Sequence, residues 1–145
     1  MEIRRAGRED VREVAELGLR LWPHHDQEKM EKDIEELLPS GRDAFFVAFR
    51  EEELLGFAQV SLRDCYVEGT HTSPVGYLEG IYVKEDMRRL EIGTRLVEAC
   101  EEWARDLGCT EFASDCHLDN EESILFHRAL GFGEEKIMCF FKPLD

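Results

Sequence analysis

The sequence lacks the patterns that mark several common classes of protein. Its five cysteines are an odd number, and none of them forms a Cys-x-x-Cys pair, which argues against a disulfide framework and a zinc site. We therefore expect reduced cysteines that pack as small apolar side chains. The Gly-x-Ser-x-Gly turn that presents the nucleophile of serine hydrolases is also absent.

Long apolar runs are missing as well. No stretch approaches the roughly 18 apolar residues that a membrane helix needs. The opening Met-Glu-Ile-Arg-Arg-Ala lacks the apolar core of a signal peptide. These two absences predict a cytoplasmic protein without a membrane partner.

Basic residues are scarce, since 18 lysines and arginines stand against 33 aspartates and glutamates, a formal net charge of −15. Binding to a phosphate backbone normally needs a basic face, so we expect no nucleic-acid partner. An acidic surface attracts cations, although such a charge also serves solubility alone. With 145 residues, 43% of them hydrophobic, the chain predicts one globular domain over residues 1–145.

Apolar periodicity and turn residues divide the chain into short strands and amphipathic helices. The expected elements are a strand at Glu2–Arg5, helices at Arg8–Trp22 and Asp26–Leu38, strands at Ala44–Phe49, Leu54–Leu62 and Val75–Val83, a helix at Ile92–Leu107, a strand at Glu111–Asp115, a helix at Asn120–Leu130 and a strand at Glu135–Phe141.

This order, β-α-α-β-β-β-α-β-α-β, predicts a mixed α/β sheet. The short acidic connection at 50–53 is typical of an antiparallel hairpin. The long helix at 92–107 joins two strands that should run parallel, in a right-handed crossover. Because ligands in such sheets bind beyond the carboxyl ends of the parallel strands, we expect the site there.

The turn before the long helix has the character of a phosphate-binding loop. The first N–H groups of a helix are unpaired and lie at the positive end of its dipole. Gly93 would let the backbone approach a phosphate closely, and Arg88 and Arg89 add positive charge. Arginine-rich turns before helices also occur without a ligand, so the loop indicates an anion site without settling it.

At this loop the sequence resembles the GNAT superfamily of acetyl-CoA-dependent N-acetyltransferases, whose phosphate loop reads Arg/Gln-x-x-Gly-x-Gly/Ala. Arg88, Glu91 and Gly93 occupy the three defining positions, and Glu91 departs from the pattern because glycine is expected there. A side chain at that position restricts the backbone. A carboxylate there repels a pyrophosphate unless it points outward.

The chain most resembles the aminoglycoside 6'-N-acetyltransferases, over essentially its whole length. The likeness is carried by residues 21–25, 64–69, 73–83, 113–115 and 126–132, of which Leu-Glu-Gly-Ile and Ala-Ser-Asp are specific to that subgroup. It implies a splayed central sheet with flanking helices, the GNAT acyltransferase fold. It further implies acetyl-CoA as co-substrate, no metal, a cationic aminoglycoside as acceptor, a role in antibiotic resistance and a homodimer.

The resemblance also implies site residues, position by position. Those expected to bind the aminoglycoside are Trp22, His25, Tyr66, Glu79, Asp115 and Glu135, the last standing beside Lys136 where the family has an acidic residue. Those expected to bind CoA are Ile81, Tyr82 and Val83, through backbone pairing with the pantetheine arm, with Arg88, Arg89, Glu91, Ile92, Gly93 and Thr94 at the pyrophosphate, and Asn120. The expected catalytic residues are Glu79 and His127, which stands where many members have a thiolate-protonating tyrosine.

The residue types support Glu79 independently. A carboxylate within an apolar strand is unfavourable unless it has a partner. Glu79 is therefore either a hydrogen-bonded structural residue or the group that pairs with a substrate ammonium and, directly or through water, accepts its proton. Gly80 beside it indicates a bulge or a close backbone approach, and Asp115 should face the same crevice from the neighbouring strand.

Structural alternatives remain for the other candidates. Trp22 and Tyr66 could be plain packing residues, His25 a solvated loop side chain and His127 a satisfied core histidine. Two functional alternatives also stay open: an acetyltransferase acting on a polyamine or another cellular amine, and a binding module that lost useful CoA binding through Glu91. Because no cysteine occupies a family nucleophile position, the amine should attack the thioester directly.

Overall fold

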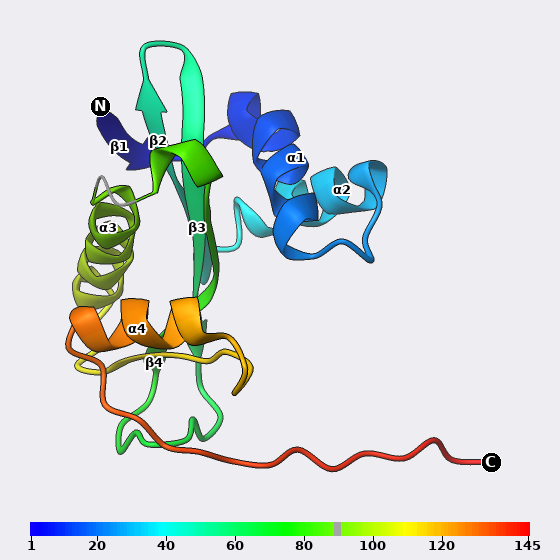
Figure 1. Cartoon of the computed structure of the whole chain (residues 1–145), viewed down its shortest axis with the longest axis vertical. Coiled ribbons are helices and arrows are strands. Elements are labelled where there is room, and N and C mark those ends of the chain that lie inside the picture. Colours follow the sequence, from blue (N-terminus) through cyan, green and yellow to red (C-terminus); the bar gives the residue numbers. More distant parts are fainter. Residues whose placement is uncertain (89–90) are drawn as a thin grey trace.

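The computed structural model describes residues 1–88 and 91–145 (Figure 1). The strands are β1 (Glu2–Arg5), β2 (Asp43–Arg50), β3 (Glu53–Arg63), β4 (Val75–Val83) and β5 (Phe112–Ser114); the α-helices are α1 (Val11–Leu21), α2 (Gln27–Leu37), α3 (Ile92–Asp106) and α4 (Glu121–Ala129); the 3-10 turns are η1 (Arg8–Asp10) and η2 (Glu85–Met87). The predicted order is confirmed as far as α4, with small shifts at the ends of elements. Arg89, an expected CoA-binding residue, lies outside the described residues.

Within the described residues, the strands form one sheet in the order β1-β2-β3-β4-β5. The pairs β1–β2, β2–β3 and β3–β4 are antiparallel, whereas β4 and β5 pair in parallel and flank α3 in the chain. The mixed sheet is thus confirmed. The pairing of β4 with β5 extends only from Gly76–Phe112 to Leu78–Ser114. The two strands separate beyond it, which opens the expected crevice.

Helices cover both faces of this sheet (Figure 1). Alternation along β2 explains the two layers, because successive side chains of a strand point to opposite faces. Phe45 and Val47 pack with α1 and α2, while Ala44 and Ala48 pack with α3. Among the described residues, no helix combines the length and the apolar character needed to cross a membrane.

The predicted last strand, Glu135–Phe141, is wrong for the isolated chain. After α4 the chain leaves the sheet, and residues 133–145 run as an extended tail past the body of the molecule (Figure 1). Ile137, Met138, Phe140 and Phe141 on this tail are 55–95% exposed. The apolar pattern of a strand is present, but a strand forms only where a neighbouring strand accepts its backbone hydrogen bonds.

The first predicted helix also begins later than expected. Residues 8–10 form the turn η1 because the buried Asp10 carboxylate accepts hydrogen bonds from Gly7 N at 2.8 Å and from both Nη atoms of Arg4, each at 2.8 Å. The Arg4 hydrogen bonds, and then the Gly7 N–H, hold the pKa of Asp10 below its usual range. This ion pair ties β1 to the start of α1.

Asp10→Asn should lower the free energy of unfolding by about 1–3 kcal/mol at pH 7, because Arg4 loses its charged partner. The folded-state pKa of Asp10 is lowered, so the carboxylate stabilises the fold above about pH 3.9, its unfolded value. That contribution disappears as the pH falls below that value. Urea denaturation should therefore show the stabilities of the two proteins converging as the pH falls below the lowered pKa of Asp10.

Glu16→Gln is the matched control for Asp10→Asn. Glu16 pairs with Arg12 at 3.7 Å on the exposed side of α1, where a salt bridge contributes less than about 1 kcal/mol. A stability difference for Asp10→Asn that is no larger than for Glu16→Gln, or that does not change with pH, would contradict the assignment.

Candidate functional site

A bulge in β4 places Glu79 at the point where the sheet opens. The β3–β4 register passes from the Gln59–Gly80 pair to the Val60–Leu78 pair, so Glu79 is the extra residue of the bulge. The pairing of β4 with β5 ends at Leu78. The bulge expected from Gly80 is confirmed, and it places Glu79 directly after the last residue of β4 that pairs with β5.

The Glu79 carboxylate is held by hydrogen bonds from β3. Ser61 Oγ donates to Oε2 at 2.5 Å, Arg63 Nε donates to the same oxygen at 3.0 Å, and Arg63 Nη2 donates to Oε1 at 2.8 Å. The Glu79 side chain is 24% exposed. Glu79 is thus a half-buried carboxylate with a bidentate guanidinium partner, an arrangement that satisfies the charge and fixes its orientation.

Asp115 joins the same network through Tyr77. The Tyr77 hydroxyl donates to Asp115 Oδ2, and the Arg63 guanidinium carbon lies 3.5 Å from the centroid of the Tyr77 ring. Burial first, and then the hydrogen bond to Asp115, raises the pKa of Tyr77, so the phenol stays protonated and keeps donating. Glu79 and Asp115, predicted to face one crevice, are linked by Arg63 and Tyr77.

Trp22 packs closely on β4. A Cβ atom at Gly80 would lie 2.5 Å from Trp22 Cζ2 and 2.7 Å from Trp22 Cη2. Glycine is therefore required at position 80 for the indole to approach the strand so closely. Because Gly80 follows Glu79, the indole lies beside the bulge.

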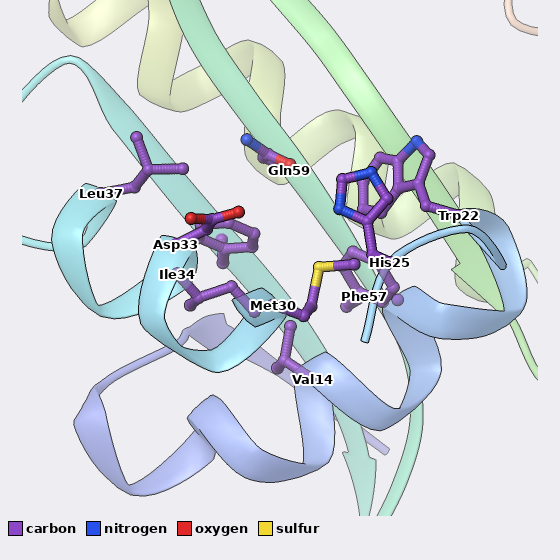
Figure 2. A pocket seen from close by; sticks show the side chains of 11 residues that line it. Val14, Trp22, His25, Met30, Asp33, Ile34, Leu37, Phe57 and Gln59 are labelled. Carbon is purple, nitrogen blue, oxygen red and sulfur yellow. The ribbon is translucent and has the colours of Figure 1, made fainter. Parts of the chain in front are cut away.

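A cavity of about 200 Å³ lies next to Trp22, between the sheet and helices α1 and α2. Figure 2 shows its apolar floor and, above it, the polar groups of His25, Asp33 and Gln59. The His25 side chain is exposed but lines this cavity. An apolar floor with a few convergent polar groups is the usual character of a small-molecule site.

The other two expected substrate-binding residues lie around the loop 64–74. Tyr66 is 74% exposed, and its hydroxyl donates to Glu68 Oε2 at 3.1 Å. Glu135, also exposed, lies against the same loop, since a Cβ at Gly69 would be 3.5 Å from Glu135 Cγ. Glu111 anchors this loop by accepting from the backbone N–H groups of residues 71 and 72, both at 2.8 Å.

The expected CoA-binding residues gather at the far end of β4. Ile81, Tyr82 and Val83 follow the bulge, beyond the last residue that pairs with β5. Arg88 folds back over this end, donating from Nε to Val83 O at 2.9 Å, with its guanidinium carbon 5.3 Å from the centroid of the Tyr82 ring. A strand edge and a cation thus adjoin the start of α3.

The start of α3 has the geometry of an anion site with one conformational strain. Glu91 is the N-cap residue and has φ 64° and ψ 10°, in the left-handed region. This explains why glycine is expected there, since the left-handed region costs a side chain roughly 1–2 kcal/mol. Ile92, Gly93 and Thr94 follow with the first N–H groups of the helix, which lack intrahelical partners. A Cβ at Gly93 would lie 3.0 Å from Phe126 Cε1, so this turn packs against α4.

His127 and Asn120 belong to α4. Asn120 caps the helix by accepting from Ser123 N at 3.1 Å. His127 Nδ1 lies 2.7 Å from the Ser123 carbonyl oxygen, which can only accept, so Nδ1 carries a proton. Within the described residues, Nε2 is buried without a hydrogen-bond partner. A buried lone pair of this kind calls for a donor, and a bound ligand is one source.

Sequence reasoning missed Ser61, which holds Glu79, and Arg63 and Tyr77, which connect the two expected carboxylates. The predicted strand ended at Leu62, so Arg63 was assigned to the following loop. The pattern could place Ser61 and Arg63 on one face of β3, but local pattern does not give the β3–β4 register, which pairs them with Tyr77 and Val75 and so brings their side chains within reach of Glu79.

Comparison with known proteins identifies the fold that carries this site. Residues 11–132 match the model of the Acetyltransferase (GNAT) family. The chain belongs to the GNAT acetyltransferase family. This membership fits the separation of β4 from β5 and the free N–H groups at the start of α3.

Several relatives within the GNAT family match nearly the whole chain. An aminoglycoside N(6')-acetyltransferase type 1 of Acinetobacter genomosp. 13 is 44% identical, covering 87% of this chain and 88% of its own. One from Acinetobacter haemolyticus is 38% identical over the full length of both chains. Among solved structures, AAC(6')-Iy with the bisubstrate analogue CoA-S-monomethyl-acetylneamine has a TM-score of 0.94 at 34% identity, covering 99% of this chain and 98% of its own.

Glu91→Gly should stabilise the fold by up to about 1 kcal/mol, because it removes the left-handed strain, although glycine also gains entropy in the unfolded chain. Glu91→Ala keeps the strain and removes only the charge. Calorimetric titration with CoA separates the two effects. If both variants bind CoA more tightly than the wild type, the charge of Glu91 weakens binding. If only Glu91→Gly binds more tightly, the restricted backbone weakens it. Unchanged affinity in both would remove Glu91 from the CoA site.

Proposed function

We infer that this chain is an acetyl-CoA-dependent aminoglycoside 6'-N-acetyltransferase. The structural observation that carries the inference is the opening between β4 and β5, with carboxylates at its mouth and a phosphate-type turn at its far end. The relatives that match nearly the whole chain are aminoglycoside N(6')-acetyltransferases. One GNAT structure of the same fold holds a molecule that joins CoA to an aminoglycoside.

The coenzyme should lie along the free part of β4. Ile81–Val83 offer backbone groups beyond the last β5 pair, so the pantetheine arm can extend the sheet as a strand would. The N–H groups of Ile92, Gly93 and Thr94 should receive the pyrophosphate. Arg88 adds a cation beside them, and Asn120 can donate from its amide nitrogen while its oxygen caps α4.

The acceptor should approach from the side of Trp22, His25 and the loop 64–74. An aminoglycoside carries several ammonium groups, which suit the carboxylates of Glu79, Asp115 and Glu135. The indole of Trp22 and the exposed ring of Tyr66 offer apolar faces to sugar rings. The neighbouring cavity provides room for part of the acceptor.

The reaction transfers the acetyl group in one direct step. The 6'-ammonium first loses a proton to Glu79, directly or through water, because only the free amine can attack. The nitrogen then forms a bond to the thioester carbon and loses its second proton to water, and the C–S bond breaks as the CoA thiolate leaves. We assign His127 as the group that protonates the thiolate, and since Nδ1 donates to the Ser123 carbonyl oxygen, Nε2 is the ring nitrogen available for this transfer.

A thiol-release assay with acetyl-CoA and either tobramycin or spermidine tests the acceptor class. We expect rapid release with tobramycin and little with spermidine, because several fixed sugar ammonium groups match carboxylates held in place. The reverse result would assign a polyamine acceptor. Absence of release with both, together with no CoA binding by calorimetry, would support the binding-module alternative.

Glu79→Gln should lower kcat with tobramycin by about 10²–10⁴-fold, the range for loss of a general base. The affinity for CoA should change less than about twofold, because Glu79 lies away from the phosphate turn. Glu98→Gln, on the exposed face of α3, is the control and should leave both unchanged. Wild-type kcat in Glu79→Gln would remove Glu79 from the chemistry.

We also propose a homodimer formed through the tail at 133–145. The exposed apolar side chains of Ile137, Met138, Phe140 and Phe141 need a cover. In the described part of the chain, β5 pairs only with β4, so its second edge can accept a strand. A tail received from a second copy satisfies both needs, and such an exchange is a common route to dimers.

Light scattering should give a mass twice the 16.9 kDa of one chain for the wild type. Phe140→Asp with Phe141→Asp should give a monomer, because charges cannot be buried in the paired tail. Leu118→Asp, an exposed leucine outside the tail, is the control and should remain dimeric. A monomeric wild type, or a dimeric double variant, would contradict the exchange.

Three general expectations complete the proposal. Residues 1–145 should act as one acetyltransferase domain. All five cysteines are free, as is usual in reducing compartments, which supports a cytoplasmic location. Transfer of an acetyl group to the 6'-amine would neutralise one cation of the antibiotic, which supports a role in resistance.

A further inference from the structure

We propose that Arg63 is a positioning and specificity residue, which leaves Glu79 one open acceptor position for one substrate amine. The proposal rests on the proposed function and deepens it. Its basis is the hydrogen-bond geometry around the Glu79 carboxylate and the support that holds Arg63 in place.

The two oxygens of an ionised carboxylate offer about four acceptor positions. Oε2 of Glu79 already accepts from Ser61 and from Arg63 Nε, and Oε1 accepts from Arg63 Nη2. Three positions are therefore occupied, and the remaining one is on Oε1. A single N–H of an incoming amine, or of one water molecule, fills it.

The orientation of this last position depends on Arg63 because the guanidinium is a rigid planar fork. Two parallel hydrogen bonds fix the rotation of the carboxylate about its terminal bond. A lysine at position 63 would keep the charge but contact the carboxylate as a point, without setting its plane.

Arg63 is itself fixed from its other side. Its guanidinium carbon lies 3.5 Å from the centroid of the Tyr77 ring, and the Tyr77 hydroxyl is anchored on Asp115. The hydrogen bonds to Glu79 raise the pKa of Arg63, so it stays charged throughout. A chain of contacts thus runs from Asp115 across Tyr77 and Arg63 to Glu79, and it joins the end of β3 and the residue after β5 to the middle of β4.

The same cation also acts on acceptor choice. It neutralises one of the two carboxylates at the mouth of the crevice, so a flexible polycation meets less uncompensated negative charge. Without Arg63, Glu79 and Asp115 would attract any polyamine through charge alone. With Arg63 present, an acceptor binds most tightly when one of its amines points at the open position on Oε1.

Steady-state kinetics of Arg63→Lys and Arg63→Met with tobramycin and spermidine test the proposal. Arg63→Lys should lower kcat for tobramycin by about 10–100-fold while KM changes less than about threefold, because charge remains but orientation is lost. Arg63→Met should lower kcat similarly and reduce the preference for tobramycin over spermidine, measured as the ratio of kcat/KM, by about tenfold or more. Calorimetric CoA affinity should stay within twofold of the wild type in both variants.

Arg105→Met is the matched control, because Arg105 pairs with Glu102 at 3.2 Å on the exposed side of α3, away from the acceptor site. It should leave kcat and the acceptor preference unchanged. A lower KM with unchanged kcat in Arg63→Met would mean that substrate displaces Arg63, which overturns the proposal. Parallel loss of thermal stability and CoA binding in both Arg63 variants would assign a structural role and also overturn it. An inactive wild type would instead refute the proposed function.

Discussion

A carboxylate placed inside a sheet strand requires a cation, and the region around the site is arranged to meet that requirement. Glu79 is the extra residue of the β4 bulge and has no partner in the β3 ladder. The bulge turns it toward β3, where Ser61 and Arg63 receive it. Beyond the bulge β4 no longer pairs with β5. The position at which Glu79 meets Arg63 is therefore also the position at which the sheet opens.

The opening serves two ligands of opposite charge. The mouth of the opening has Glu79, Asp115 and the loop 64–74, and its negative charge attracts cations. The end near the start of α3 has Arg88 and the first N–H groups of the helix, which attract phosphates. The chain has a net charge of −15, so the phosphate end is a local exception, formed by backbone dipoles and few cations. Separation of the two potentials along one strand would bring each ligand in from its own direction.

The sequence could predict what depends on local pattern. Periodicity gave the helices and the strands up to α4, the glycine at position 80 indicated the bulge, and the departure at Glu91 indicated a strained backbone, which its φ of 64° confirms. Local pattern could not predict how segments far apart in the sequence pair with one another. Arg63 lies 16 residues before Glu79, and their contact depends on a register that a long loop and a bulge both shift. The tail at 135–141 has the composition of a strand, yet a strand is defined by its partner, which local pattern does not specify.

The contact of Phe126 with Gly93 has a consequence for the length of the segment between the two ligand sites. The distance from the pyrophosphate of CoA to its thiol is a constant of the coenzyme. The protein must therefore hold the start of α3 and the bulge at Glu79 at one matching separation, and α4 braces the first of these points. Insertions or deletions between Glu79 and Gly93 would change the distance between the bulge and the start of α3, so that it would no longer match the length of the coenzyme. The loop at 64–74 does not lie between these two points, so the length of CoA does not constrain it. Related chains should therefore differ in length more often in this loop.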